Sequence, residues 1–301
     1  MKKLTLAALV LSVCASGALS QAKPKPTPAK ASSAPRKIVF AVLNDGKTLE
    51  PIGYVSSKGA FSEPVNGSGE AAALKSFSNT YYKKGSSYSL VFGGTKSGTV
   101  TVKNSNVATE CGKNTADVTS KGTALKGLLM GVATNLPVKN PSSTRRKPTA
   151  AEKGDADSIA RAEFAKEKLT PKTLHYQNLT AINVGGSNGD TLVASYWVEI
   201  DKLTRGLLFF IAGKGSNGKY SVSYREYRKV DQADVMSGQI TAVDEGIYHE
   251  LLLDYLDVSG DGVAEIFTYQ QGFEGAGFTA FERKAGRWQK AYEFNNYHCG
   301  F

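Results

Sequence analysis

The segment Asp257–Glu265, with the sequence DVSGDGVAE, carries oxygen-bearing groups at alternate positions. A calcium loop needs carboxylates at alternate positions of a tight turn and a glycine where the chain bends sharply, and Gly262 stands at that place. The candidate ligands are Asp257, Ser259, Asp261, the carbonyl oxygen of Val263, and Glu265. The pattern predicts one structural Ca²⁺ ion, although the same Asp and Gly residues also fit a plain hairpin turn.

The twelfth position of this loop is Thr268, where a helical calcium motif has a bidentate Glu. The segment instead resembles the strand-flanked calcium loops of the FG-GAP and VCBS repeat families, in which DxDGDGxxD/E joins two strands. Here Ser259 replaces the usual acid, and Glu265 stands where Asp is commoner. The resemblance covers residues 252–294, with a fainter copy at 179–227. It implies a β-rich repeat with a calcium loop, and it leaves the N-terminal half unassigned.

The segment QQGFEGAGF, residues 270–278, follows the strand that comes after this loop. It combines glycines with one acid and two aromatic rings, a composition that suits contact with a glycan or a peptide. The candidate ligand-binding residues are Phe273, Glu274 and Phe278. In the alternative interpretation the two rings pack beneath the sheet as core residues.

Catalytic motifs are weak throughout the chain. The glycine pattern GKGSNG, residues 213–218, lies between two expected strands, whereas a dinucleotide site needs a strand followed by a helix. His175, His249 and His298 lack the mutual spacing of metal ligands. The acids of residues 150–301 single out no pair for glycoside hydrolysis. The sequence therefore favours a binding or interaction protein without catalytic activity, and a hydrolase acting on envelope polysaccharide or peptide is the alternative.

Cysteine usage predicts one disulfide bond, between Cys111 and Cys299. On the chain-entropy model, closing so long a loop stabilises the fold by about 4–5 kcal/mol. It also attaches the C-terminus to the N-terminal half. The alternatives are two buried thiols, or a Cys111 nucleophile with His249 or His298 as its base.

Residues 1–20 have the pattern of a secretory signal peptide. Lys2 and Lys3 precede an apolar stretch, and Ala-Leu-Ser ends the segment before Gln21. Cys14 would be the lipidated residue in a lipoprotein, but the bulky Val13 before it disfavours that processing. We therefore expect a periplasmic or secreted protein. No segment is long enough to span a bilayer.

The formal net charge of +10 is concentrated in linkers. Residues 21–36 and 139–149 are Pro- or Ser-rich, and each has four basic residues and no acid. Residues 37–138 have 11 basic and 6 acidic residues, whereas residues 150–301 have 16 and 21. Because the excess basic charge is not concentrated on one folded surface, nucleic-acid binding is disfavoured. The opposite net charges of residues 37–138 and residues 150–301 favour docking of these two segments against each other. The expected partner is a protein or glycan of the envelope.

These sites require a mainly β fold made of two modules. Residues 37–138 predict a small β-rich module, with a short helix around residues 70–77. Residues 150–301 predict a helix at 156–169, ended by Pro171, and then two degenerate copies of a four-stranded antiparallel unit. The copies begin with residues 179–200 and 252–273, and each starts with two apolar strands joined by a polar turn. The fold class is therefore two β-rich modules with one short helix between them.

Overall fold

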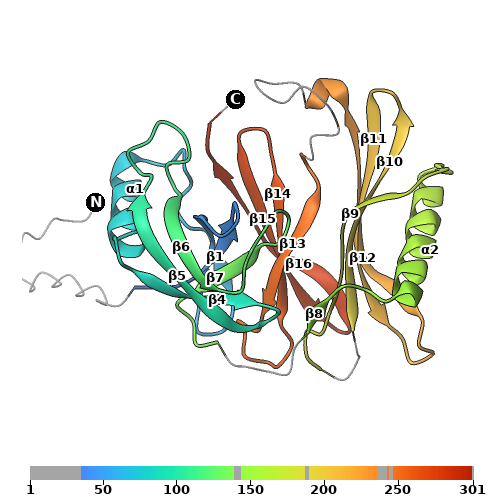
Figure 1. Cartoon of the computed structure of the whole chain (residues 1–301), viewed down its shortest axis with the longest axis horizontal. Helices are drawn as coiled ribbons and strands as arrows, with labels where there is room; N and C mark the ends of the chain where they lie inside the picture. The colour runs from blue at the N-terminus through green and yellow to red at the C-terminus, as the bar shows by residue number, and fades with distance from the viewer. Residues whose placement is uncertain (1–34, 139–143, 187–189, 236–242, 244–246, 300–301) are drawn as a thin grey trace, which may run out of the picture. The chain divides into compact units, whose positions relative to one another are not determined.

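Antiparallel strands make up half of the described chain and helices about an eighth, so the mainly β prediction is confirmed (Figure 1). The computed structural model describes residues 35–138, 144–186, 190–235, 243 and 247–299. The predicted signal peptide and almost all of the Pro-rich linker lie outside the described residues. Within the described part, no helix is long and apolar enough to cross a membrane.

The N-terminal module is a six-stranded antiparallel barrel, because β2 pairs back onto β1 and closes the sheet. The order around the sheet is β1-β7-β4-β5-β6-β2, and β3 extends it beside β2. Its strands are β1 (Lys37–Leu43), β2 (Thr48–Val55), β3 (Phe61–Ser62), β4 (Ser87–Phe92), β5 (Thr95–Ser105), β6 (Ala116–Gly122) and β7 (Gly131–Thr134). The helix α1 (Ala71–Tyr81) contributes Phe77 and Tyr81 to the cluster that also holds Phe40 of β1.

The C-terminal module contains the two predicted four-stranded units. The first is the meander β9-β10-β11-β12, which β8 extends to five strands, and the second is β13-β14-β15-β16. The strands of the first sheet are β8 (Arg145–Arg146), β9 (His175–Ile182), β10 (Thr191–Asp201), β11 (Thr204–Lys214) and β12 (Tyr220–Asp231). Those of the second sheet are β13 (Glu250–Leu256), β14 (Glu265–Gln271), β15 (Gly275–Lys284) and β16 (Arg287–Tyr297). A single 3₁₀ turn, η1 (Gln232–Asp234), follows β12.

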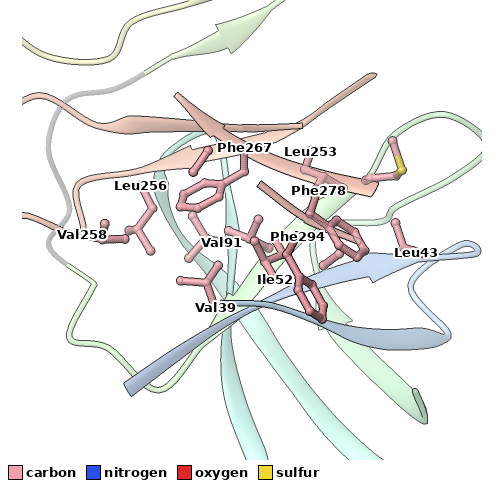
Figure 2. Close-up of a cluster of buried hydrophobic side chains, with 14 of the residues drawn as sticks. Val39, Leu43, Ile52, Val91, Leu253, Leu256, Val258, Phe267, Phe278 and Phe294 are labelled. Atoms are coloured by element: carbon pink, nitrogen blue, oxygen red, sulfur yellow. The ribbon is translucent and has the colours of Figure 1, made fainter. Parts of the chain in front are cut away.

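The four-stranded sheet is buried on both faces, which agrees with the consecutive leucines 251–253 of β13. Leu251 and Leu253 face the barrel, whereas Leu252 and Tyr255 face the five-stranded sheet. Figure 2 shows barrel and sheet side chains meeting in one cluster, among them Val39, Ile52, Val91, Phe267, Phe278 and Phe294. Burying one such side chain is worth roughly 1.5–3 kcal/mol. The contact between the oppositely charged halves is therefore built mainly from apolar side chains.

The predicted helix is α2 (Ala150–Lys166), which packs along the five-stranded sheet (Figure 1). It begins at a capping box, in which Thr149 accepts from the backbone of Glu152 and Glu152 accepts from the backbone of Thr149. Ala156, Ala160 and Phe164 form its buried face. The structure thus confirms both predicted helices with shifted ends: α2 spans 150–166 where the sequence predicts 156–169, and α1 spans 71–81 where it predicts 70–77.

Arg145 and Arg146, which the charge pattern assigns to a solvated linker, lie instead in β8 and are paired. Arg146 forms ion pairs with Glu152 and Asp190. The Arg145 side chain is 5 % exposed, and its Nη1 lies 3.8 Å from the fully buried carboxylate of Asp254. The same Nη1 donates to the carbonyl oxygen of Leu253 at 2.6 Å. Buried charge therefore fixes the place where the barrel, β8 and β13 meet.

Cys111 and Cys299 lie at disulfide distance, with their sulfur atoms 2.02 Å apart. They are separated by 188 positions in the sequence. The pairing attaches the last described residue to the loop between β5 and β6, as the cysteine usage predicts.

Asp254→Ala should lower the free energy of unfolding by about 3–5 kcal/mol, because Arg145 would keep a buried charge without its partner. Urea unfolding of the purified protein measures this change. Asp117→Ala, at an exposed position of β6, is the control and should change stability by no more than about 0.5 kcal/mol. Equal losses in the two variants would contradict the structural role of Asp254.

Candidate functional site

The predicted ion loop joins β13 to β14 as a tight turn. Asp257 accepts from the backbone N–H of Gly260 at 2.6 Å and from that of Gly262 at 3.1 Å. Asp261 accepts from the backbone N–H of Val263 at 2.8 Å. The carboxylates therefore shape the turn through backbone hydrogen bonds, as Asp does in polar turns.

Glu265 lies at the first position of β14 and is only 7 % exposed. Its Oε2 accepts from the backbone N–H of Val258 at 2.9 Å. Burial raises the pKa of Glu265, hydrogen bonds from Val258 and Ser259 oppose that change, and the charge of Asp257 adds to it. Glu265 therefore folds back onto the start of the loop, where Ser259 donates to Asp257 at 3.4 Å.

The turn at Val184 and Gly185, between β9 and β10, packs against this loop. The backbone N–H of Ala264 donates to the carbonyl oxygen of Val184 at 2.7 Å, so the corresponding turns of the two repeats touch. Gly185 has a φ of +88°, and a Cβ atom there would lie 2.3 Å from the carbonyl oxygen of Gly262. Only glycine permits this approach. A hollow of about 300 Å³ adjoins the loop and is lined by Tyr255, Asp257 and Asp261 among others.

The chemistry of the loop fits calcium, which takes oxygen ligands only. Asp257, Ser259 and Glu265 supply such oxygens and interact with one another. Asp261 also has carboxylate oxygens in the turn, but its Oδ1 already accepts a hydrogen bond from the backbone N–H of Val263. Among the residues that the structure describes, no group of three or more His, Cys, Asp or Glu side chains is placed to hold a metal. A calcium ion at this loop stays a prediction.

The predicted ligand loop, residues 270–278, contributes one exposed acid. Glu274 is exposed and lines a hollow of about 260 Å³. Phe273 is partly buried against the cluster that contains Val230 and Val235. Phe278 is 1 % exposed and belongs to the core between the barrel and the four-stranded sheet. Phe278 therefore offers no surface to a ligand in this structure.

The same loop borders a longer groove between the barrel and the C-terminal sheets. Two hollows, of about 430 Å³ and about 320 Å³, share the residues Leu43, Asn44, Tyr269 and Gln271. We call the two together the Glu50 groove. Each hollow is in the size range of small-molecule sites, which is roughly 300–1,000 Å³.

One end of the Glu50 groove contains a buried polar cluster. Glu50 is 1 % exposed, and its Oε1 lies 2.7 Å from Nε2 of His298 and accepts from Asn296 at 2.8 Å. Burial lowers the pKa of His298, but the hydrogen bond and the charge of Glu50 outweigh it, so the pKa is raised above its usual value. Burial and the charge of Glu50 raise the pKa of Tyr269. Glu50, His298 and Tyr269 all line the same hollow of about 320 Å³.

Sequence reasoning did not single out Glu50, Asn296 or Tyr269, and it treated His298 as isolated. These residues come from β2, β14, β16 and the segment after β16, so their spacing in the sequence contains no signal. The predicted disulfide is the one sequence feature that indicates where His298 lies, because Cys299 follows His298 directly. It places the C-terminal residues against the N-terminal module.

Comparison of the chain with protein-family models, with curated proteins and with solved structures finds no match among any of the three. The resemblance to FG-GAP and VCBS repeats therefore depends on the loop motif and the strand pattern alone.

The His298–Glu50 pair predicts a loss of stability at alkaline pH. Glu50 raises the folded-state pKa of His298 above the unfolded value of about 6.5. The contribution of the pair is therefore fully present below pH 6.5 and is lost as the pH rises through the folded pKa. His298→Gln should remove this part of the slope when unfolding free energies are measured between pH 6 and 9. The control is His175→Gln, because His175 is an exposed residue of β9. This variant should keep the wild-type dependence of unfolding free energy on pH. The same dependence in wild type, His298→Gln and His175→Gln would refute the coupling.

Proposed function

We propose that this chain is an exported binding protein of the cell envelope or extracellular space, with the Glu50 groove as its ligand site. The observation that supports this proposal is that the residues lining the groove come from three different sheets. Asn44 comes from the barrel, Gln177 from the five-stranded sheet, and Gln271 from the four-stranded sheet. Ligand sites commonly lie where separate structural units meet, because such junctions are concave and combine several polar groups.

The chemistry of the groove supports recognition over bond cleavage. Glycoside hydrolysis by paired carboxylates requires two such groups on opposite sides of the scissile bond. Within the described lining, Glu50 is held by His298 and Asn296. Asp45 accepts from the backbone N–H of Gly127 at 2.9 Å and lies on an exposed turn. Each carboxylate therefore already accepts at least one hydrogen bond from the protein, which suits the two groups poorly to act as a catalytic pair.

We further propose that the loop Asp257–Glu265 binds one structural calcium ion. Its support is the turn geometry, in which Glu265 accepts from the backbone N–H of Val258 at 2.9 Å and Ser259 donates to Asp257 at 3.4 Å. The loop also touches the turn at Val184 and Gly185. An ion there would stabilise the contact between the two repeats by neutralising neighbouring carboxylates.

Calcium should raise the melting temperature of the purified protein relative to chelator. An ion that binds only the folded state stabilises it by about 2.7 kcal/mol at a hundredfold excess over the dissociation constant. Asp261→Ala should abolish this gain, and differential scanning calorimetry in calcium and in chelator measures it.

Asp190→Ala is the matched control for the calcium response. Asp190 lies in the corresponding turn of the first repeat and forms an ion pair with Arg146. The variant should melt lower than wild type in both buffers and keep the full calcium response. Identical melting of the wild-type protein in calcium and chelator would show that the loop is a polar turn only.

Envelope binding can be separated from envelope hydrolysis in one sedimentation experiment. The purified protein is mixed with washed, insoluble envelope material, and both the pellet and the supernatant are analysed. We expect the wild-type protein in the pellet, Gln271→Ala largely in the supernatant, and no polymer fragments released. Released saccharide or peptide fragments would replace the binding proposal with a hydrolase, and failure of the wild-type protein to sediment would count against both.

A further inference from the structure

We propose that the Glu50 groove recognises a neutral oligosaccharide, whose hydroxyl groups bind Glu50 and the surrounding amides. This inference depends on the proposed binding function and adds the chemical class of the ligand. It comes from the shape of the groove, from the buried acid at one end of it, and from the uncharged polar groups along its walls.

The shape favours an elongated ligand of more than one ring. The two hollows adjoin because Leu43, Asn44, Tyr269 and Gln271 line both. One hollow extends toward Leu128 and Gln177, and the other toward Glu50 and His298. A single small ring would leave one of the two hollows empty.

The buried acid favours a ligand that donates hydrogen bonds. Glu50 lines the groove, and both hydrogen bonds that the structure describes on its carboxylate end on Oε1. Oε2 is therefore the oxygen left to accept from a bound molecule. A carboxylate with so little exposure gains most from a donor inside the groove, because charged hydrogen bonds are stronger than neutral ones. Sugar hydroxyls donate in this way and carry no charge that must be desolvated.

The walls favour hydroxyl groups over phosphate or an apolar ligand. They present amides and hydroxyls that both donate and accept, as sugar hydroxyls do. These side chains are Asn44, Thr48, Asn106, Gln177 and Gln271. Within the described lining the only Lys or Arg is Lys47, whose Nζ lies 3.9 Å from Asp45 in an exposed pair, so the groove lacks the cationic cluster that phosphate needs.

A fixed aromatic side chain completes the lining. Tyr269 lies between the two hollows, and its ring centroid lies 5.9 Å from that of Phe278 in the core. This packing holds the Tyr269 side chain in place. Tyr269 and Leu43 therefore offer apolar contact to the C–H faces of sugar rings in the middle of the groove.

The test is isothermal titration calorimetry of the purified full-length protein with neutral oligosaccharides. The probes are hexamers of glucose in two linkages, of mannose, and of N-acetylglucosamine, with an unstructured neutral decapeptide as the comparison ligand. We expect at least one hexamer to bind the wild-type protein. Gln271→Ala and Gln177→Ala should each weaken that binding roughly 2- to 10-fold, and Glu50→Gln more than 10-fold, since a charged hydrogen bond is lost.

Gln289→Ala is the matched control, because Gln289 is an exposed glutamine of β16 outside the groove, and it should leave affinity unchanged. The two glutamine variants carry the test if Glu50→Gln fails to fold. If the decapeptide binds, Gln271→Ala weakens that binding, and no hexamer binds, the saccharide assignment is refuted and the proposed binding function is retained. Hexamer binding that no groove variant changes would refute the assigned site. Absence of binding to every probe would overturn the inference, while the sedimentation experiment would still decide the proposed function.

Discussion

The fold depends on satisfying one buried carboxylate. Asp254 lies in β13 where the register with β14 shifts, and it is fully buried between the barrel and the C-terminal sheets. Burial raises the pKa of Asp254 to about 7, and the charge of Arg145 and the backbone N–H groups of Tyr255 and Gly93 act against that change. Such a group is tolerated only when donors surround it. The donors come from β8, from β13 itself and from the turn after β4. The buried carboxylate is therefore satisfied only when these three segments are in their folded positions.

Arg145 extends this requirement to a second set of contacts. Its guanidinium group donates to the carbonyl oxygens of Met130 and Leu253, and it lies 4.6 Å from the centre of the Phe92 ring. Apolar burial supplies most of the attraction between barrel and sheet, but it is non-directional. The Asp254–Arg145 pair adds direction, because a buried charge that slides away from its partner loses several kcal/mol. The pair therefore restricts the position in which the barrel packs on β13.

The sequence predicted the parts of the fold that depend on local patterns. Alternation and turn residues identified the two four-stranded units, and the cysteine count identified the pair Cys111 and Cys299. Closure of the barrel was not predictable, because it depends on β1 pairing with both β2 and β7 across the module. The charge of Arg145 was misleading for a similar reason. Basic residues in a Pro-rich segment are usually solvated, and only the distant Asp254 explains the burial of this one. Glu50 and Asn296 are likewise brought together across 246 positions by tertiary structure alone.

One strand, β14, links the two candidate sites and limits how they can influence each other. It begins at Glu265 in the ion loop and ends at Gln271 in the Glu50 groove, a span of about 20 Å at the rise of a β-strand. β14 pairs with β13 on one side and β15 on the other, and Ile266 and Phe267 pack on its opposite faces. A strand held at both edges and on both faces has no second position to move to. An ion at Glu265 would therefore strengthen the hairpin without reshaping the groove, so its effect belongs to stability and not to ligand affinity.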